Sequence, residues 1–560
     1  MNRYAVYHMP DSQYCFPVSE KEIVLRLRTA KNDIQKAYVI YENKYDFGVK
    51  QKKTEMTKAF EGELFDYFTI KLTLEDTRLA YVFYVFDGEE YYYFSEDGIT
   101  KEYDYTLGYY NFFQYPYINK ADIMHDVLWM HNAVFYQIFV DRFAMGDANK
   151  DKAYINCKWG DVPTPSTFAG GDLVGICENL DYIKSLGVNA IYLTPVFESD
   201  SNHKYDIIDY MKTDNQFGGN AVLKKLVDTA HKKGMRIVLD AVFNHCSYKL
   251  EQFQDCLKNG RQSKYYDWFI IHGDKPDMDK LNYEMFGPCN YMPKLNTSNA
   301  EVQRFLIDIA CHYLKEYKID GWRLDVSDEV SHDFWRSFRK KVKEINEDAV
   351  IIGENWHDAS NCLRGEQYDS IMNYSFTKCM LDYFATNSKD ACQAAWKLCD
   401  ILMRNTDTVN NMMLNLLDSH DTHRFYTQVS CDIQKLKSAL CILFLFKGTP
   451  CIYYGTEVLM EGGYDPDCRR CMDFSRCNEE DKNIISFINK LSALRKQYDL
   501  SQGRYVITSQ NDVFIMEIHL ETDIIKLFVN NTCKDTFVND LECRKESFVL
   551  MVSDKDWMKE

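Results

Sequence analysis

The chain has 560 residues, which is more than one ordinary hydrophobic core organises and indicates two to four domains. Hydrophobic residues make up 46% and charged residues 27%, an ordinary balance for a globular protein. The 66 basic and 84 acidic residues give a formal charge of -18, spread without long runs of one sign. This acidity argues against nucleic acids and anionic membrane surfaces as partners, because both attract clusters of Lys and Arg.

The N-terminus and the cysteines set an expectation about cellular location. The opening stretch, MNRYAVYHMPDSQY, has no basic region followed by an apolar one, so it does not have the pattern of a secretion signal. The apolar stretch 439–446 is too short to span a bilayer. The 19 cysteines are odd in number and scattered, which favours free thiols in a reducing compartment. We therefore expect a cytoplasmic protein without a membrane segment.

Residues 1–118 have the pattern of short β-strands. Apolar and polar residues alternate near 23–28, 36–41 and 67–74. The dipeptide Asp87-Gly88, between two apolar runs, predicts a hairpin because Asp-Gly accepts the positive φ of a tight turn. These signals predict an N-terminal β-sandwich. Its many tyrosines are expected in a core and an interface, with a sugar-stacking surface as the alternative.

From about residue 130 the pattern changes to strands followed by helices. An amphipathic helix is expected from Ala221 to Gly234, and the capping box Ser298-x-x-Glu301 predicts the start of another. Strands are predicted at 135–143, 190–196, 236–243, 320–326, 349–355, 370–375, 412–418 and 450–455. This alternation predicts an α/β fold, a (β/α)8 barrel over residues 119–500. Residues 246–297 are expected to be an insertion after the third strand, and residues 501–560 a small C-terminal β domain.

Acidic residues close several of the predicted barrel strands. Asp325, Glu354 and Asp421 each follow an apolar run, and barrel active sites lie at the C-terminal ends of the strands. One such carboxylate is usually structural, but three on one rim repel one another and need a functional reason. Glycoside hydrolysis supplies it, because one carboxylate attacks while another, still protonated, assists departure. Arg323 lies two residues before Asp325 on the same strand face and can hold it ionised, while Glu354 is expected to have a raised pKa.

Several motifs resemble those of the α-amylase superfamily, glycoside hydrolase family 13. The strand-end segments are Asp240-Ala-Val-Phe-Asn244-His245, Gly321-Trp-Arg323-Leu-Asp325, Gly353-Glu354-Asn-Trp356 and Leu417-Asp418-Ser-His420-Asp421. Further matches are Asn202-His203-Lys-Tyr205-Asp206 and the segment 448–457. Met292-Pro-Lys-Leu-Asn296 resembles the version in neopullulanases, cyclomaltodextrinases and maltogenic amylases. Those enzymes also carry an N-terminal sandwich, which resembles a carbohydrate-binding module.

The resemblance implies roles for individual residues. Asp325 matches the family nucleophile, Glu354 the general acid/base, and Asp421 the carboxylate that binds the 2- and 3-hydroxyls of the distorted sugar. The other implied substrate-binding residues are Arg323, His245, His420, Tyr205, His203, Trp356, Asp467 and Arg469. The implied activity is hydrolysis, with retention, of α-1,4 bonds in maltooligosaccharides, cyclodextrins, pullulan or starch. Cleavage of α-1,6 bonds stays open.

Two departures from the family pattern concern the acceptor side and a metal. After the nucleophile the chain has Val326-Ser327-Asp328-Glu329 where relatives have Val-Ala-Asn-Glu, which leaves linkage preference and transglycosylation open. Relatives often bind calcium in a loop whose counterparts here are Asp147, Asp151, Gly170 and Asp172. Met145 and Lys150 replace two oxygen ligands of that loop, and calcium needs six or more. We expect no required cofactor, with Ca2+ as the open alternative.

Alternatives remain at the level of the sequence. An oligo-1,6-glucosidase or α-glucosidase would share the barrel, but the N-terminal sandwich and the 292–296 motif disfavour it. A catalytically inactive relative acting as a binding subunit is disfavoured because all three carboxylates are present. The resemblance implies a homodimer through the N-terminal domain. The sequence does not rank cyclodextrin, pullulan and starch as substrates.

Overall fold

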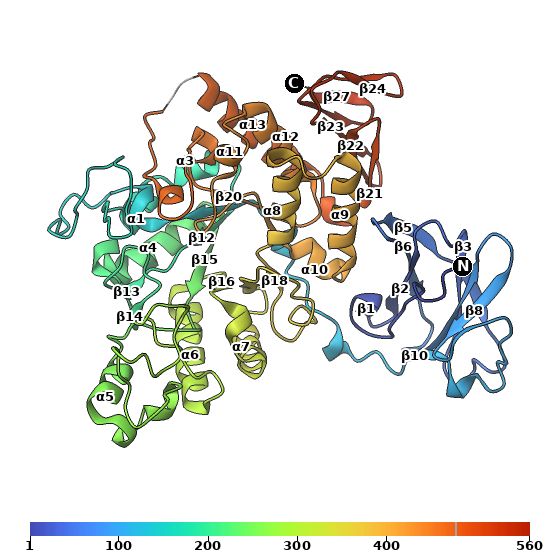
Figure 1. Ribbon diagram of the computed structural model, residues 1–560, viewed down its shortest axis with the longest axis horizontal. Helices are drawn as coiled ribbons and strands as arrows, with labels where there is room; N and C mark the ends of the chain where they lie inside the picture. Colours follow the sequence, from blue (N-terminus) through green and yellow to red (C-terminus); the bar gives the residue numbers. More distant parts are fainter. Residues whose placement is uncertain (477–478, 560) are drawn as a thin grey trace. The chain divides into compact units, whose positions relative to one another are not determined.

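An eight-stranded parallel sheet dominates the computed structural model, which describes residues 1–476 and 479–559 (Figure 1). Its strand order is β18-β17-β16-β15-β12-β11-β20-β19. In chain order the strands are β11 (Phe135–Ile138), β12 (Ala190–Leu193), β15 (Arg236–Ala241), β16 (Gly321–Leu324), β17 (Val350–Gly353), β18 (Ser370–Ile371), β19 (Leu414–Leu416) and β20 (Thr449–Tyr453). A parallel bridge between Met372 and Leu414 joins the two edges. The predicted (β/α)8 class is therefore confirmed.

Helices cover the barrel strands. They include α4 (Gly219–Lys232), α6 (Ala300–His312), α7 (His332–Ile345), α8 (Tyr374–Met380), α12 (Ile433–Leu445) and α13 (Glu479–Gln497). In α4 the buried side chains are Leu223, Leu226, Val227 and Ala230, at the i, i+3, i+4, i+7 spacing of one helical face. Gly234 follows this helix at φ +75°, a left-handed conformation that glycine adopts without steric penalty. The strands are buried on both faces and are therefore mostly apolar, but β15 and β16 carry the buried polar residues Asp240 and Arg323.

The structure corrects two local predictions. The first strand ends at Ile138, and Val140–Phe143 form the helical turn α1 instead of continuing to 143. The cap of α6 is Asn299, whose side chain accepts hydrogen bonds from the N–H groups of Glu301 and Val302. Ser298 and Asn299 are both good caps, so the sequence alone left the helix start ambiguous by one residue.

An insertion follows β15, as predicted. It carries α5 (Glu251–Asn259) and returns toward the barrel through isolated bridges, His245 with Lys294 and Met285 with Pro293. The segment between these bridges has little regular structure, so its side chains are placed by local hydrogen bonds. Tyr283, for example, donates to the carbonyl of Asn290 at 2.5 Å.

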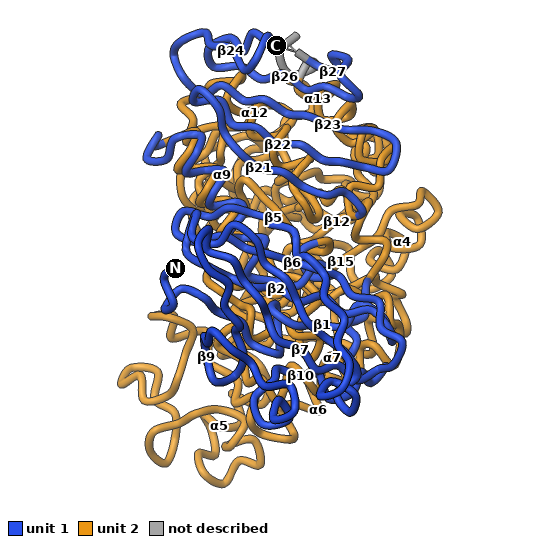
Figure 2. The backbone as a smooth tube through the Cα atoms, turned by 90° about the vertical axis from the view of Figure 1, so that its right-hand side faces the viewer, with its two compact units in different colours: residues 1–126, 386–410, 502–560 blue, residues 127–385, 411–501 orange. Residues whose placement is uncertain are grey.

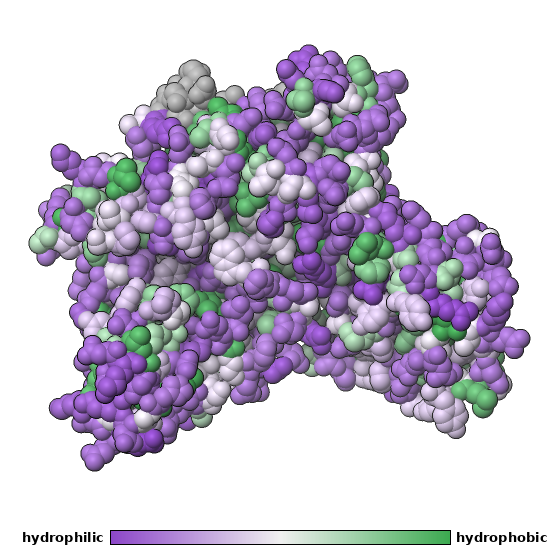
Figure 3. Space-filling view, in the orientation of Figure 1, coloured by the Kyte–Doolittle hydropathy of each residue, from purple (hydrophilic) through white to green (hydrophobic). Residues whose placement is uncertain are grey.

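The chain divides into two units (Figure 2). Unit 1 contains residues 1–126, 386–410 and 502–560, and unit 2, which holds the barrel, contains residues 127–385 and 411–501. The predicted boundaries at 118 and 500 stay a prediction, because helix α9 (Ala391–Met403) belongs to unit 1 although it lies inside the predicted barrel range. No helix among the described residues is long and apolar enough to cross a bilayer. Hydrophilic residues predominate on the face shown in Figure 3.

Unit 1 begins with two antiparallel sheets, with strand orders β1-β2-β6-β5 and β4-β3-β7-β8-β9, where β10 also pairs with β7. The strands are β1 (Cys15–Ser19), β2 (Glu22–Ala30), β3 (Lys36–Glu42), β4 (Lys52–Glu55), β5 (Thr57–Glu61), β6 (Phe65–Thr73), β7 (Leu79–Phe86), β8 (Tyr91–Ser95), β9 (Gly98–Thr100) and β10 (Phe113–Tyr115). Asp87-Gly88 lies in the β7–β8 turn, as expected. The predicted N-terminal β-structure is confirmed.

The C-terminal part of unit 1 is a five-stranded antiparallel sheet, β21-β22-β23-β26-β27, with a separate pair β24-β25. Its strands are β21 (Arg504–Gln510), β22 (Val513–His519), β23 (Ile524–Asn530), β24 (Thr536–Val538), β25 (Leu541–Cys543), β26 (Ser547–Val552) and β27 (Lys555–Lys559). The predicted C-terminal β-structure is therefore present. The thiol of Cys399 on α9 donates to the carbonyl of Ile507, so this helix packs on β21. The eighteen described cysteines are all free thiols.

His8 is a buried titratable group in the N-terminal core. Its ring nitrogens lie 2.7 Å from the Arg26 carbonyl and 2.7 Å from the Tyr81 hydroxyl, and its side chain is surrounded by aromatic rings. Burial lowers the pKa of His8 to about 3, so it stays neutral in the folded protein at pH values where an unfolded chain would protonate it. The stability it provides is therefore present above pH 6.5 and is lost as the pH falls toward 3.

We expect this loss to be measurable. Between pH 8 and pH 5 the titration of His8 should lower the free energy of unfolding by about 2 kcal/mol, because the unfolded state takes up a proton that the folded state refuses. Urea unfolding of wild type and His8→Gln at both pH values gives the contribution as a difference. The variant should be less stable at pH 8 and should lose about 2 kcal/mol less on acidification. An equal loss in both proteins would contradict the assignment.

Candidate active site

Three carboxylates that follow barrel strands line one cleft of unit 2. Asp325 follows β16, Glu354 follows β17, and Asp421 lies in the loop after β19. The cleft has a volume of about 500 Å3. The other lining residues are His203, Tyr205, His245, Phe286, Cys289, Tyr291, Met292, Val326, Asp328, Glu329, Trp356, Tyr464, Asp465 and Arg469. The parallel sheet explains the gathering, because all its strand ends point to one rim.

Arg323 lies at the centre of the acidic cluster. Its Nη1 is 2.9 Å from Asp325 Oδ1 and 2.9 Å from Asp240 Oδ2, and its Nη2 is 2.9 Å from Glu354 Oε2. The guanidinium is buried, so water does not screen these ion pairs. One cation therefore holds three carboxylates, which leaves the cluster with an excess of negative charge. Asp240 supports this arrangement and also accepts hydrogen bonds from the hydroxyls of Tyr192 and Tyr205.

The backbone after β16 orients Glu354. Val326 has φ 45° and ψ 45°, a left-handed conformation that a β-branched residue rarely adopts. In this conformation its N–H donates to Glu354 Oε2 at 2.9 Å. The Ser327 hydroxyl donates to the Glu354 carbonyl at 2.6 Å. Asp325 Oδ2, 3.9 Å from His245 Nε2, has no hydrogen-bond partner among the described residues.

The carboxyl groups of the cluster titrate differently. Burial raises the pKa of Glu354, as expected, although Arg323 opposes the shift. Burial also raises the pKa of Asp325 well above its usual range, and Arg323 lowers it without outweighing burial, which differs from the expectation that Arg323 holds Asp325 ionised. For Asp421 burial is outweighed by His420, Arg469 and Arg323, which lower its pKa. Because Asp325 and Glu354 share one guanidinium, they titrate as a pair, whereas the lowered pKa of Asp421 favours its ionised form.

Three histidines of the family pattern are neutral at physiological pH. Burial lowers the pKa of His245 and His420 to about 3 and that of His203 to about 4. His420 Nδ1 lies 2.7 Å from Gln137 Nε2, and its Nε2 lies 2.6 Å from the Tyr205 hydroxyl. Neutral imidazoles can donate and accept at once, which suits sugar hydroxyls.

Asp421 is held by Arg469 in the loop that also contains Asp465 and Asp467. Arg469 Nη2 donates to Asp421 Oδ1 at 3.1 Å, and Arg469 Nη1 lies 2.9 Å from Asp465 Oδ1. Asp467 does not line the cleft, because its carboxylate binds the Arg470 guanidinium and the Gly463 N–H. Asp465 lines it instead. The structure thus places Asp465 and Arg469 of this loop on the cleft, and the sequence could not tell the two aspartates apart.

Aromatic side chains form two walls of the cleft. Trp356 stacks on Tyr374 with ring centroids 3.8 Å apart and an interplanar angle of 4°, and it remains 45% exposed. Phe286 stacks on His245 at 4.7 Å and 20°. Such flat, exposed faces can pack against the apolar faces of sugar rings.

The sequence predictions missed the lining that the insertion supplies. Phe286, Cys289 and Tyr291 come from residues 246–297, where the strand and helix periodicities fail, so their direction could not be inferred. Their position directly before the 292–296 motif could have indicated that they lie near the cleft. Tyr464, in the same loop as Asp465, was missed for the same reason.

The loop that resembles a calcium site does not fit calcium. Lys150 Nζ donates to the carbonyls of Gly170 and Gln216 at 2.6 and 2.9 Å and to Asp172 Oδ2 at 2.9 Å. Its side chain is 5% exposed. Asp147 and Asp151 accept backbone N–H groups of their own turns, and Asp172 caps α2 (Leu173–Glu178) through the Gly175 N–H. The ammonium thus takes the oxygen atoms that a cation would need.

A closed parallel barrel with paired carboxylates at its strand ends is the arrangement of a glycoside hydrolase. The family described as Alpha amylase, catalytic domain, matches residues 137–502, and Alpha amylase, N-terminal ig-like domain, matches residues 1–119. A cyclomaltodextrinase of Thermoanaerobacter pseudethanolicus is 41% identical over 553 residues, which are 98% of this chain and 96% of the relative. The intracellular maltogenic amylase of Bacillus subtilis is 39% identical, covering 94% and 90%.

A solved structure of a cyclomaltodextrinase superposes with a TM-score of 0.91 at 39% identity, covering 96% of this chain and 92% of that one. The chain belongs to the α-amylase family. It is a glycoside hydrolase of the type that includes cyclomaltodextrinases, maltogenic amylases and neopullulanases.

The geometry predicts that Arg323 sets the acid limb of the pH–rate profile. Arg323→Lys keeps one charge but loses the planar fork that reaches several carboxylates, so hydrolysis should fall at least about a hundredfold. The Lys ammonium contacts fewer carboxylates and lowers the pKa of Asp325 less than Arg323 does. As the pH is lowered, the variant should therefore lose activity at a higher pH than the wild type. Measuring kcat/KM from pH 4 to 8 tests this. Arg470→Lys, which alters an ion pair outside the cleft, is the control. An unmoved acid limb would contradict the role of Arg323.

Proposed function

We propose that the chain hydrolyses α-1,4-glucosidic bonds of short α-glucans by double displacement, with retention of the anomeric configuration. The observation that carries the proposal is that Asp325 and Glu354 line one cleft and contact the same guanidinium. Retaining enzymes need two carboxyl groups about 5–5.5 Å apart, close enough for one to bond covalently to the sugar. Two carboxylates on one arginine support that arrangement over the wider spacing of inverting enzymes.

In this proposal Asp325 is the nucleophile. Its Oδ1 is held by Arg323, while Oδ2 carries no hydrogen bond that would have to break before attack. Oδ2 bonds to the anomeric carbon as the glycosidic bond to the leaving oxygen breaks. Water then attacks the same carbon and releases Asp325 as a carboxylate.

Glu354 is the proposed acid and base. Its burial-raised pKa favours a carboxyl group that still has its proton when substrate arrives. It gives that proton to the departing oxygen and later takes one from the attacking water. The Val326 N–H on Oε2 keeps the carboxyl group in place through both steps.

The remaining polar residues of the cleft are proposed to hold the sugar at the point of cleavage. Asp421, whose pKa is lowered, stays ionised and accepts from the 2- and 3-hydroxyls. Tyr205 offers its ring, and the neutral histidines donate and accept hydrogen bonds. Trp356 is proposed to line the acceptor side. Arg469 orients Asp421 and adds a positive charge beside it.

Substitution of the two catalytic candidates tests the proposal. Asp325→Asn and Glu354→Gln keep the shape of each side chain, so the fold should persist, while turnover should fall by at least about a thousandfold because the covalent step or the proton transfer is lost. Release of reducing sugar from maltotriose measures this, with circular dichroism to verify folding. The matched control is Asp328→Asn, which changes a carboxylate of the same cleft that is not among the three bound by Arg323. A tenth of wild-type activity in either catalytic variant would refute the assignment.

The substrates are proposed to be maltooligosaccharides and cyclodextrins, because the relatives named cyclomaltodextrinase and maltogenic amylase match nearly the whole chain. An oligo-1,6-glucosidase or α-glucosidase is disfavoured by the match of residues 1–119 to the N-terminal family domain. An inactive binding subunit is disfavoured by the complete set of carboxylates. Side-by-side assays on cyclodextrin, pullulan and starch rank the substrates. Cleavage only at the ends of linear chains, with no hydrolysis of cyclodextrin, would favour the α-glucosidase.

We also propose a homodimer formed through the N-terminal domain. The sheet containing β7 and β8 carries a row of tyrosines, in which Tyr84 stacks on Tyr91 with centroids 4.8 Å apart and Tyr93 on Tyr103 at 5.7 Å. Lys53 Nζ lies 4.4 Å above the Tyr84 ring. Interfaces are enriched in tyrosine, so this partly exposed row supports an assembly surface.

Light scattering of the intact chain at micromolar concentration tests the dimer, which should have about twice the 66.0 kDa of one chain. Tyr91→Lys places a charge in the tyrosine row and should weaken the dimer at least about tenfold, because a charge must be desolvated on association. Tyr4→Lys makes the same change at a fully exposed position and should have no effect. A monomeric wild type would sink the proposal without affecting the catalytic residues.

No bound calcium is proposed for the 145–172 loop, because the Lys150 ammonium supplies the positive charge there. Chelators should therefore leave the melting temperature unchanged within about 2 °C. Lys150→Asn removes the ammonium and leaves the buried Asp172 unpaired, so its melting temperature should fall by several degrees and rise again on adding calcium. Lys152→Asn, an exposed neighbour, is the control. A drop of about 10 °C on adding EDTA to wild type would overturn the claim.

A cytoplasmic location and the division into domains at 118 and 500 complete the proposal. The B. subtilis relative is named an intracellular maltogenic amylase, which supports that location. The family matches to residues 1–119 and 137–502 support the division of the chain.

A further inference from the structure

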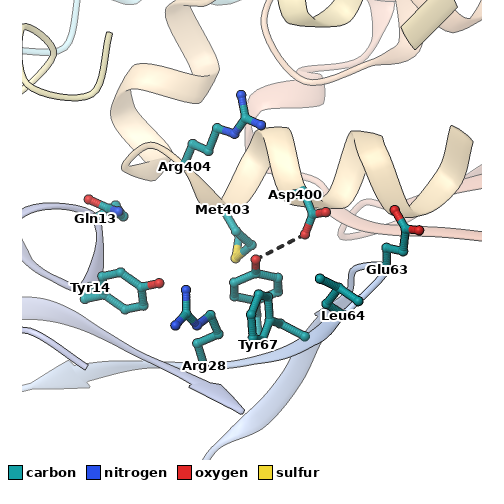
Figure 4. A pocket seen from close by; sticks show the side chains of 10 residues that line it. Gln13, Tyr14, Arg28, Glu63, Leu64, Tyr67, Asp400, Met403 and Arg404 are labelled. Atoms are coloured by element: carbon teal, nitrogen blue, oxygen red, sulfur yellow. Dashed lines mark hydrogen bonds between the residues drawn. The ribbon is translucent and has the colours of Figure 1, made fainter. Parts of the chain in front are cut away.

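A second cavity lies entirely within unit 1, between the sheet containing β2 and β6 and helix α9. It has a volume of about 320 Å3, which is enough for about ten water molecules and at the lower end of small-molecule sites. Figure 4 shows Tyr14 and Arg28 on the sheet side and Met403 and Asp400 on the helix side, facing one another. The cavity shares no residue with the barrel cleft.

The walls of this cavity are braced before any ligand binds. The buried Arg26 donates hydrogen bonds to the carbonyls of Gln13 and Asn405 and forms an ion pair with Asp407 at 2.7 Å. It thereby ties the segment before β1 to the chain that follows α9. A pocket held in this way needs little reorganisation to bind a ligand.

The cavity's polar groups are also fixed. The Arg28 guanidinium lies over the rings of Tyr7 and Phe65, at 4.9 and 4.2 Å from their centroids. The Tyr67 hydroxyl donates to Asp400 Oδ1 at 3.1 Å (Figure 4). Gly62 leaves room for the Asp400 carboxylate, because a Cβ on residue 62 would come within 2.2 Å of Asp400 Oδ1.

The chemistry of the lining indicates a neutral ligand rich in hydroxyl groups. The lining contains two arginines, Arg28 and Arg404, and two carboxylates, Glu63 and Asp400, so the formal charges cancel and neither an anion nor a cation is favoured. Guanidinium groups only donate hydrogen bonds and carboxylates only accept them, and a hydroxyl can do both. Apolar surface from tyrosine, methionine and leucine side chains lies between these groups, as the C–H face of a sugar ring requires.

We propose that this cavity is a second carbohydrate site, which holds the terminal glucose units of a maltooligosaccharide. The class of ligand rests on the proposed function of the barrel cleft. Asp400 and Glu63 accept from sugar hydroxyls, Arg28 donates to them, and Met403 packs against the ring. Substrate anchored in this way would raise the local concentration of chain ends for the enzyme.

Methyl NMR of the full chain separates this site from the cleft. Met403 lines the cavity and Met292 lines the cleft, so their labelled methyl groups report on the two sites in one sample. The Asp325→Asn variant is titrated with maltotriose, and Met403→Leu and Met292→Leu assign the two signals. Both signals should shift, each with its own dissociation constant.

Variants then locate the contacts. Arg28→Leu and the isosteric Asp400→Asn should each raise the dissociation constant measured at Met403 about tenfold, the usual loss for a hydrogen bond to a charged group. The dissociation constant measured at Met292 should stay unchanged. Arg3→Leu, at an exposed position of the same unit, is the matched control. Asp400→Asn keeps the shape of the side chain, so it decides the question if Arg28→Leu does not fold.

Each other outcome is decisive. A shift of Met292 alone would overturn the second site and leave the proposed function intact. A shift of neither signal would count against both. A Met403 signal that moves with inorganic phosphate but not with maltotriose would replace the carbohydrate site with an anion site.

Discussion

The site depends on one buried cation, Arg323, that is shared by three carboxylates. Without it Asp240, Asp325 and Glu354 would repel one another at the ends of adjacent strands, and their pKa values would rise further. With it, they form a compact cluster that still has more negative than positive charge. That excess is what an oxocarbenium-like transition state needs, because positive charge develops on the sugar between the carboxylates.

The barrel makes this sharing possible through strand register. Arg323 pairs with Asp240 on β15 and with Ile352 on β17, so its side chain enters the barrel level with both neighbouring strands. The next residues leave the sheet, and Val326 adopts a strained left-handed conformation that turns its N–H to Glu354. The strained conformation of Val326 persists because its hydrogen bond to Glu354 and the buried ion pairs of Arg323 together hold the backbone in place.

Much of this could be predicted from the sequence, because barrel strands are short apolar runs and the polar residues that close them are visible. Asp325 and Glu354 follow such runs directly, and the parallel topology brings them together. Side chains on irregular segments could not be predicted. Phe286 reaches the cleft from an insertion without periodicity, and Asp465 lines it where Asp467, two residues later in the same loop, does not. The raised pKa of Glu354 was predicted, but that of Asp325 was not, since it depends on burial in three dimensions.

The anomeric configuration of the first product tests the central claim most directly. Proton NMR recorded in the first minutes of maltotriose or cyclodextrin hydrolysis distinguishes the α- and β-anomers before they interconvert in solution. Two carboxylates that share Arg323, one attacking and one donating a proton, require two inversions at the anomeric carbon, so the α-anomer should appear first. The β-anomer as first product would mean a single displacement by water, and it would contradict the account of Asp325 as a nucleophile.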